Sequence, residues 1–175
     1  MKNVCIFFLM AIIISLTAFG MLAPTSELTQ SNYLRMHIRA HSNQSTDQAI
    51  KYEIRDEIVN ALTPIVAECE SKAQAVARIQ TCLGYLAQVA IDALQRNGIS
   101  YGAKAELRVE MFPTRVYEGY TLPQGEYLAL IVQLGEGAGD NWWCVVYPPL
   151  CFTTSSTPIV YKSKILEIIK NFKKG

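Results

Sequence analysis

One cysteine and two histidines are the side chains of this chain that could support nucleophilic catalysis. Cys144 lies in the stretch GAGDNWWCVVYPPLCF, residues 137–152, while His37 and His41 lie in the stretch HIRAH. A thiol nucleophile needs a base beside it to become a thiolate. Cys144 with His37 would therefore give a hydrolase. Because no nucleophile motif surrounds the cysteine, we keep this chemistry as the alternative hypothesis and predict no catalytic residue.

The two histidines have the spacing of a zinc-binding helix, because His37 and His41 are four residues apart. The stretch lacks the glutamate of the H-E-x-x-H motif, and its pattern predicts a strand followed by a turn. We therefore predict no metal site and no cofactor. We expect instead one strand histidine and one turn histidine, each hydrogen-bonded to the backbone.

Three glycines resemble a phosphate-binding loop in spacing alone: Gly135, Gly137 and Gly139. Phosphate-binding loops join a strand to a helix whose N-terminal amides face the phosphate. Here a predicted strand follows the glycines, so the sequence predicts a hairpin turn.

Residues 1–23 have the composition of an export signal. Lys2 precedes a long apolar run, and the small residues Ala18 and Gly20 fit a signal-peptidase cleavage site. The run is also about 20 residues long, enough for residues 4–22 to remain as a membrane anchor. In either case Lys2 marks the retained side, and the remainder of the chain is expected beyond the membrane.

Outside the cell, cysteines can form disulfides. Cys144 and Cys151 are separated by six residues that include two prolines, so a bridge would close a short loop. The alternative is a pair of buried free thiols. Cys69 and Cys82 lie on different predicted helices, where they either pair across the helical hairpin or remain ordinary core thiols.

The periodicity of the apolar residues predicts an α+β fold. The four expected strands are residues 33–40, 105–111, 127–134 and 142–147. The three expected helices are residues 45–66, 71–97 and 159–173. A short connection joins the first two helices, which predicts an antiparallel helical hairpin. We expect this hairpin and the terminal helix to pack on one face of a mostly antiparallel sheet, with 127–134 as a central strand.

The exported part is long enough for one hydrophobic core and too short for two. We expect one domain over residues 30–152, then a polar linker and a basic amphipathic helix over residues 153–175. The net charge of +1 gives no reason to expect nucleic-acid binding. The lysines of the terminal helix could contact anionic lipid headgroups. These are Lys162, Lys164, Lys170, Lys173 and Lys174.

Two long stretches resemble a known family. They are YLRMHIRAHSNQSTDQAIKYEIRDEI and FPTRVYEGYTLPQGEYLALIVQLGEGAGDNWWCVVYPPLCF. Together they resemble the stage II sporulation protein R family of endospore-forming Firmicutes, over residues 32–152. The family reads R-x-H-V-x-A-N-S-D near the first stretch. This chain departs from that pattern at Ile38 and at residues 41–43.

The resemblance implies a signalling protein that is secreted from the forespore into the intermembrane space. There it would bind a membrane-embedded aspartic protease and activate it, so that the protease removes the pro-sequence of sigma-E. Exposed aromatic residues beside a rigid proline corner are typical anchors of such protein contacts. The partner-binding residues that we predict are Phe112, Arg115, Trp142, Trp143, Tyr147, Pro148 and Pro149.

Three hypotheses follow from the sequence. The first is an exported ligand that activates a membrane protease, and it carries no catalytic chemistry of its own. The alternative is a cell-envelope hydrolase that uses Cys144 with His37. The third is a structural module of the envelope with no switching role.

Overall fold

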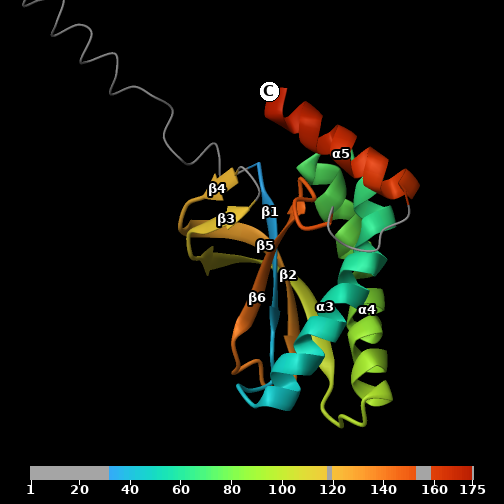
Figure 1. Ribbon diagram of the computed structural model, residues 1–175, viewed down its shortest axis with the longest axis vertical. Helices are drawn as coiled ribbons and strands as arrows, with labels where there is room; N and C mark the ends of the chain where they lie inside the picture. Colours follow the sequence, from blue (N-terminus) through green and yellow to red (C-terminus); the bar gives the residue numbers. More distant parts are fainter. Residues whose placement is uncertain (1–31, 118–119, 153–158, 175) are drawn as a thin grey trace, which may run out of the picture.

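The computed structural model describes residues 32–117, 120–152 and 159–174. Over these residues the expected α+β architecture is confirmed, with a helical hairpin on one face of a mostly antiparallel sheet (Figure 1). The predictions for the signal or anchor at 1–23 and the linker at 153–158 lie outside the described residues. None of the described helices is both long and apolar enough to cross a bilayer.

The helical hairpin consists of α3 (Ser45–Ala67) and α4 (Lys72–Arg96). Pro64 lies inside α3, and the helix runs through it without ending. The hydroxyl of Ser71 caps α4 by accepting a hydrogen bond from the Gln74 N–H, at 3.2 Å. After α4, Gly98 has a φ of 70°, the left-handed conformation that favours glycine at the end of a helix.

The main sheet has four strands in the order β2-β5-β1-β6. They are β1 (Leu34–Arg39), β2 (Ala103–Phe112), β5 (Gly125–Leu134) and β6 (Asn141–Tyr147). β5 lies between β2 and β1, as its uninterrupted apolar run predicts. β1 and β5 are parallel, while the other two pairs are antiparallel.

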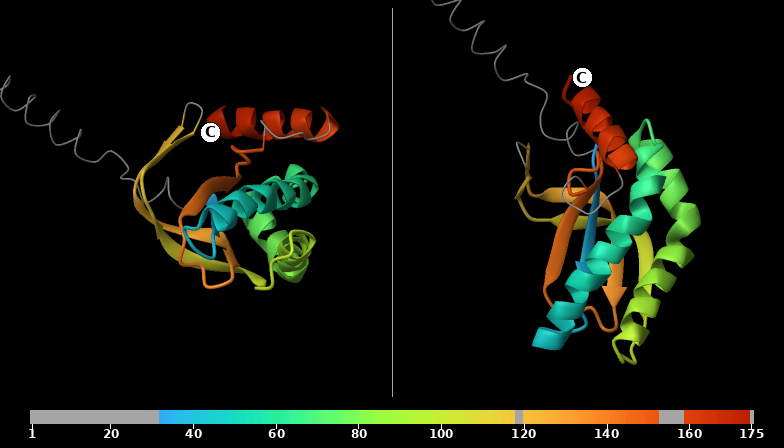
Figure 2. Two further views of the ribbon diagram at one scale, coloured as in Figure 1. Left: turned by 60° about the horizontal axis from the view of Figure 1, so that its bottom comes forward. Right: turned by 45° about the vertical axis from the view of Figure 1, so that its right-hand side comes forward.

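A small hairpin follows β2 and was not predicted. It pairs β3 (Arg115–Tyr117) with β4 (Tyr120–Leu122). Strands of three residues are too short to show a period of two, and for that reason the sequence gives no signal for them. Figures 1 and 2 show this hairpin on the side of the sheet opposite α3 and α4.

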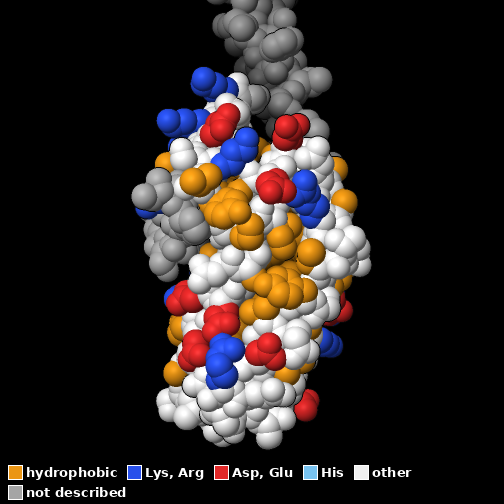
Figure 3. All heavy atoms as spheres, turned by 90° about the vertical axis from the view of Figure 1, so that its right-hand side faces the viewer, with side chains coloured by type: hydrophobic (Ala, Val, Ile, Leu, Met, Phe, Trp, Pro, Cys, Tyr) orange, Lys and Arg blue, Asp and Glu red, His pale blue; other side chains and the backbone are white. Residues whose placement is uncertain are grey.

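The larger core lies between the sheet and the helical hairpin. Leu34, Met36 and Ile38 of β1 point into it and are fully buried, as are Ile54 and Ile58 of α3. The terminal helix α5 (Ile159–Lys174) crosses one end of the hairpin (Figure 2) and contributes Ile165 to the same core. Hydrophobic side chains form a band over the face that carries the helices, with charged side chains at both ends (Figure 3).

The glycine-rich loop does not form the hairpin turn that the sequence predicts. It joins β5 to β6, and those strands lie on either side of β1 without pairing. The loop therefore crosses the end of β1, where the Gly139 N–H donates to the Ala40 carbonyl at 3.0 Å. A Cβ on Gly139 would lie 2.2 Å from the Ser42 carbonyl oxygen, so only glycine fits this close approach of two backbones.

Candidate functional site

The second face of the sheet, opposite α3 and α4, carries two buried basic side chains. Arg35 and His37 alternate along β1 with the core residues, and both are fully buried. Long charged side chains are almost never fully buried unless they are paired. We therefore treat the groups around Arg35 and His37 as the candidate functional site.

Arg35 lies inside a set of aromatic rings. Its guanidinium carbon is 4.3 Å from the ring centre of Phe112 and 4.8 Å from that of Tyr127. Its nitrogens donate to the Tyr117 hydroxyl at 3.1 Å and to the Pro113 carbonyl at 3.4 Å. No carboxylate of the described residues forms an ion pair with Arg35. Cation–π contacts, each worth about 2 kcal/mol when desolvated, replace the missing counter-charge.

These contacts position the small hairpin. Pro113 lies two residues before β3, and Tyr117 is the last residue of β3. Arg35 of β1 donates hydrogen bonds to both. On the outer side, the Arg115 guanidinium lies 5.7 Å from a Trp143 ring centre. Val116, on the same strand, is 76% exposed. The arrangement gives a projecting hairpin with Arg115 beside Trp143 on one face and the exposed Val116 on the other.

His37 is held between two aromatic rings and one carboxylate. Its ring stacks on Trp143 with centres 4.8 Å apart, and it tilts against Phe112 at 5.3 Å. Nε2 lies 2.5 Å from Oε2 of Glu110. Burial lowers the pKa of His37 from 6.5 to about 4, and the opposing charge of Glu110 only partly offsets this effect. The ring is therefore neutral at pH 7, and its buried Nδ1 has no hydrogen-bond partner within the described residues.

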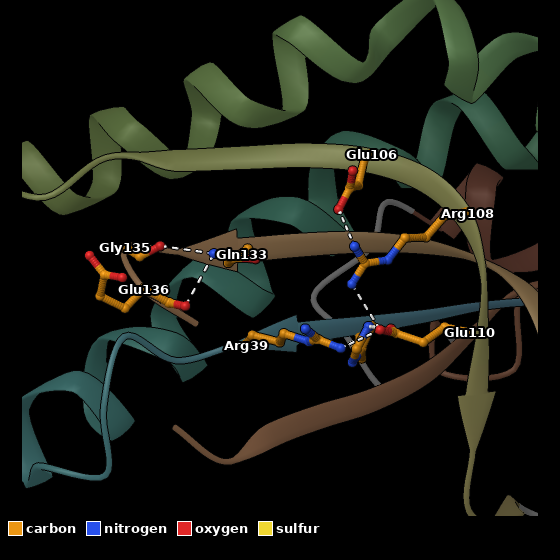
Figure 4. A network of polar contacts seen from close by, with 8 residues as sticks. Arg39, Glu106, Arg108, Glu110, Gln133, Gly135 and Glu136 are labelled. Atoms are coloured by element: carbon orange, nitrogen blue, oxygen red, sulfur yellow. Dashed lines mark hydrogen bonds and ion pairs between the residues drawn. The ribbon is translucent and has the colours of Figure 1, made fainter. Parts of the chain in front are cut away.

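Glu110 is the centre of a charged network that spans two strands (Figure 4). Arg108 of β2 joins Glu106 at 3.0 Å to Glu110 at 2.8 Å, and Arg39 of β1 also pairs with Glu110. Burial acts to raise the pKa of Glu110, but the contact with His37 and the two guanidinium groups outweigh it and leave the pKa below its usual value. The carboxylate therefore stays ionised beside the neutral histidine.

Coiling of the sheet brings Glu110 to His37. His37 is in register with Ile131 of β5, and Ile131 is in register with Glu106 of β2. Glu110 is four residues further along β2. In a flat sheet its Cα atom would therefore lie roughly 16 Å from the Cα atom of His37, given about 4.8 Å between strands and 3.3 Å per residue. The observed contact requires β2 and β5 to curl over β1, and this curl buries the second face.

The structure does not gather the predicted partner-binding residues on one surface. Trp142 and Trp143 point to opposite faces of β6, and Trp142 packs on the helical side beside Arg55. Only Arg115 and Trp143 share an accessible surface. The others are buried: Phe112, Tyr147, Pro148 and Pro149.

The pairing of Cys144 with His37 is wrong. Cys144 is joined to Cys151 by a disulfide, with Cα atoms 6.0 Å apart. Cys144 also points into the core below the helices, whereas His37 points to the second face. Neighbouring register positions on a strand pair point to opposite faces, and Cys144 is in register with Met36 rather than with His37.

The remaining candidates behave as structural residues. Nδ1 of His41 accepts a hydrogen bond from the Glu136 N–H at 3.0 Å, as a turn histidine is expected to do. His37 differs from the expectation, because its partner is a side chain rather than the backbone. In residues 32–117, 120–152 and 159–174, no three His, Cys, Asp or Glu side chains are grouped so as to hold a metal ion.

Cys69 and Cys82 are both free. Cys69 lines a cavity of about 670 Å³ between α5 and the turn that joins α3 to α4. Burial raises the pKa of the Cys69 thiol, so it stays protonated at neutral pH and is a poor nucleophile. Lys164 of α5 also lines this cavity and pairs with Glu167 at 3.9 Å.

Sequence reasoning missed Arg35, Glu110, Tyr117 and Tyr127 as members of the site. Their polar or aromatic character alone does not separate them from ordinary surface residues of a two-faced strand. One signal existed. Arg35 and His37 match the R-x-H of the family pattern, and both are now seen to be buried.

Comparison with known proteins identifies the family of this chain. The family model described as Stage II sporulation protein R matches residues 30–157. Stage II sporulation protein R of Bacillus subtilis strain 168 is 34% identical to this chain over 119 residues, which cover 68% of this chain and 53% of that protein. The chain thus spans about half the length of this curated relative. No solved structure matches the chain.

Proposed function

Because this sporulation protein belongs to the stage II sporulation protein R family, we propose that it is an exported signal that activates a membrane-embedded aspartic protease. The protease then removes the pro-sequence of sigma-E. In this proposal the chain is secreted from the forespore into the intermembrane space. Residues 1–23 deliver it there, either as a cleaved signal or as an anchor formed by residues 4–22.

The small hairpin is the observation that carries a binding role. Arg35 holds it through Tyr117, Arg115 lies on that same face beside Trp143, and Val116 projects from the opposite, exposed face. A rigid apolar and aromatic projection loses little conformational entropy when a partner covers it. We therefore assign the contact with the protease to β3 and the adjoining edge of β6.

Activation also sets an energetic requirement. A ligand shifts a partner between two states only by the difference in its affinity for them. Moving an equilibrium from mostly inactive to mostly active needs roughly a 10⁴-fold preference for the active state. The hairpin must therefore fit a surface that the protease presents in its active state alone.

Contact with anionic lipid is a second part of the proposal. The last turn of α5 carries Lys173 and Lys174, and each lysine near an anionic surface contributes about 1 kcal/mol of attraction. Such contact would hold the domain beside the membrane in which the protease lies.

Co-expression in a non-sporulating host tests the proposal. The chain is produced with the protease and pro-sigma-E, both with and without residues 1–23, and cleavage of pro-sigma-E is followed. We expect cleavage only when the chain is present. Cleavage in its absence, or none in its presence, would contradict the proposal. If sigma-E processing persists in a sporulating strain that lacks the gene, the structural-module hypothesis is favoured instead.

A matched pair of variants tests the surface. Val116→Asp places a charge on the hairpin, and Val160→Asp places the same charge on α5 at an equally exposed position, 76% in both cases. We expect Val116→Asp to reduce cleavage at least tenfold and Val160→Asp to preserve it, with both proteins unfolding at the wild-type temperature. Equal activity of the two variants would remove the hairpin from the proposed contact.

A further inference from the structure

One long edge of the main sheet is open. β2 has ten residues and pairs with β5 alone among the described strands, so its outer N–H and C=O groups have no strand partner there. Long edge strands template pairing with another strand unless short length, proline, a bulge or charged side chains prevent it. β2 contains no proline, and its ladder with β5 shows no register shift.

The two faces of β2 differ sharply. Lys104, Glu106, Arg108 and Glu110 alternate in charge along the second face. The opposite face is apolar, and at its far end Val109 and Met111 are 61% and 55% exposed. These two apolar side chains lie next to the open edge, where a paired strand would cover part of their surface.

The charge pattern is complementary to itself. If a second copy of β2 runs antiparallel with a two-fold axis through Leu107, Lys104 lies opposite Glu110 and Glu106 lies opposite Arg108. All four charged residues then face the opposite sign. Moving the axis by one residue in either direction sets like charges opposite each other, Glu106 against itself or Arg108 against itself.

The same register also suits the apolar face. Met111 lies opposite Ala103, and Val109 lies opposite Ala105, so each large exposed side chain meets a small one. Lys104 makes no ion pair with any described residue. In the paired arrangement it gains the carboxylate of Glu110 from the other copy.

We propose that two copies of this chain associate through β2, in antiparallel register about a two-fold axis at Leu107, to form one continuous eight-stranded sheet. The inference rests on β2 and does not depend on the proposed function. An interface of this kind is isologous and closes on itself, so it gives a dimer and not a fibre. A single strand edge of roughly 33 Å is a small interface, so the dimer is expected to dissociate on dilution.

Cysteine cross-linking tests the register. In the full chain, held in a mild detergent, Cys5 and Cys82 are replaced by serine so that neither can form a cross-link, and Cys69 is left in place because it is buried. Leu107→Cys or Val109→Cys is then added, the protein is mildly oxidised, and cross-linked dimer is measured on a non-reducing gel. A thiol at position 107 faces its own copy across the axis, whereas a thiol at position 109 lies four residues away from its copy, at roughly 13 Å along the strands.

We expect dimer from Leu107→Cys and little from Val109→Cys, although position 109 is the more exposed of the two. Random collision predicts the reverse order, because it follows exposure. Cross-linking at position 109 that equals or exceeds that at 107 therefore overturns the proposal.

A charge reversal keeps the proposal testable if Leu107→Cys does not fold. Lys104→Glu sets a carboxylate opposite Glu110 at two symmetric places, which should raise the dissociation constant roughly tenfold. Lys162→Glu on α5 makes the same change in net charge away from β2 and should leave the dissociation constant unaltered. A wild-type mass of one 19.5 kDa chain at every concentration, or equal effects of the two reversals, also overturns the proposal.

Discussion

Acidification should destabilise this protein through His37. Its pKa falls from 6.5 in the unfolded chain to about 4 in the folded protein. As the pH drops, the unfolded chain therefore binds this proton first. The free energy of unfolding is unaffected by His37 above pH 6.5, decreases between pH 6.5 and 4, and levels off below that range. At about 1.4 kcal/mol per pKa unit, the full loss is about 3 kcal/mol, and about 2 kcal/mol of it should be lost by about pH 5.

Urea unfolding of the oxidised full chain, followed by tryptophan fluorescence at pH 7.5 and at pH 5, measures this loss. The comparison variant is His37→Gln, which cannot titrate. We expect it to lose roughly 2 kcal/mol less than the wild type over the same interval, whatever its stability at pH 7.5. Glu110 does not interfere, because its pKa lies below 4.5 and its contribution is lost only at lower pH.

His41→Gln is the matched control, because it removes the other histidine and leaves the buried one in place. This variant should keep the loss that is due to His37. If His37→Gln and the wild type lose the same stability between pH 7.5 and 5, then His37 is not held neutral by burial, and our account of the second face is incorrect.

Three further predictions concern the fold. Replacing Cys144 and Cys151 by serine should lower the free energy of unfolding by about 2 to 3 kcal/mol, from loop-closure entropy; denaturant unfolding with and without reductant measures it, and an unchanged midpoint would argue against the bridge. Gly84→Ala in α4 should raise the free energy of unfolding by about 0.5 to 1 kcal/mol, because a Cβ there meets nothing within 4 Å. Gly139→Ala should instead lower it by about 1 to 3 kcal/mol. Thermal unfolding measures both, and a shift of the two variants in the same direction would contradict this reasoning. Arg35→Lys should destabilise more than Arg35→Met by about 2 kcal/mol, because an ammonium ion is more strongly hydrated and cannot stack on the rings; the reverse order in urea unfolding would show that the positive charge itself stabilises the site.

Local pattern was sufficient for the elements that face the larger core. Leu34, Met36 and Ile38 alternate along β1, and the sequence places them on one face correctly. Ser71 and Gly98 mark the ends of α4 through capping and backbone conformation, which depend on a few neighbouring residues. Periodicity and end signals are local properties, so a single sequence contains them.

The candidate site was beyond such reasoning. Alternation predicts only that Arg35 and His37 share the other face of β1, where a polar residue is usually solvated. Whether that face is buried depends on how far β2 and β5 curl. The curl is a sum of small twists over ten-residue strands, and no single residue records it.

The path of the loop at Gly139 could not be predicted from local pattern either. Its glycines correctly predict a tight backbone, but not the strand that it crosses. Strand order is decided by competition among all pairings of the sheet, and a sequence-based prediction pairs neighbours by default.

The sequence by itself therefore determined the α+β class, the helical hairpin, the central strand and the family, because each rests on residues close together in the chain. Only the tertiary structure decided that Glu110 meets His37, that Arg35 is enclosed by aromatic rings, and that the edge of β2 is left open. These features join residues separated by tens of positions. Their energies come from burial and coiling, which exist only once the whole sheet has formed.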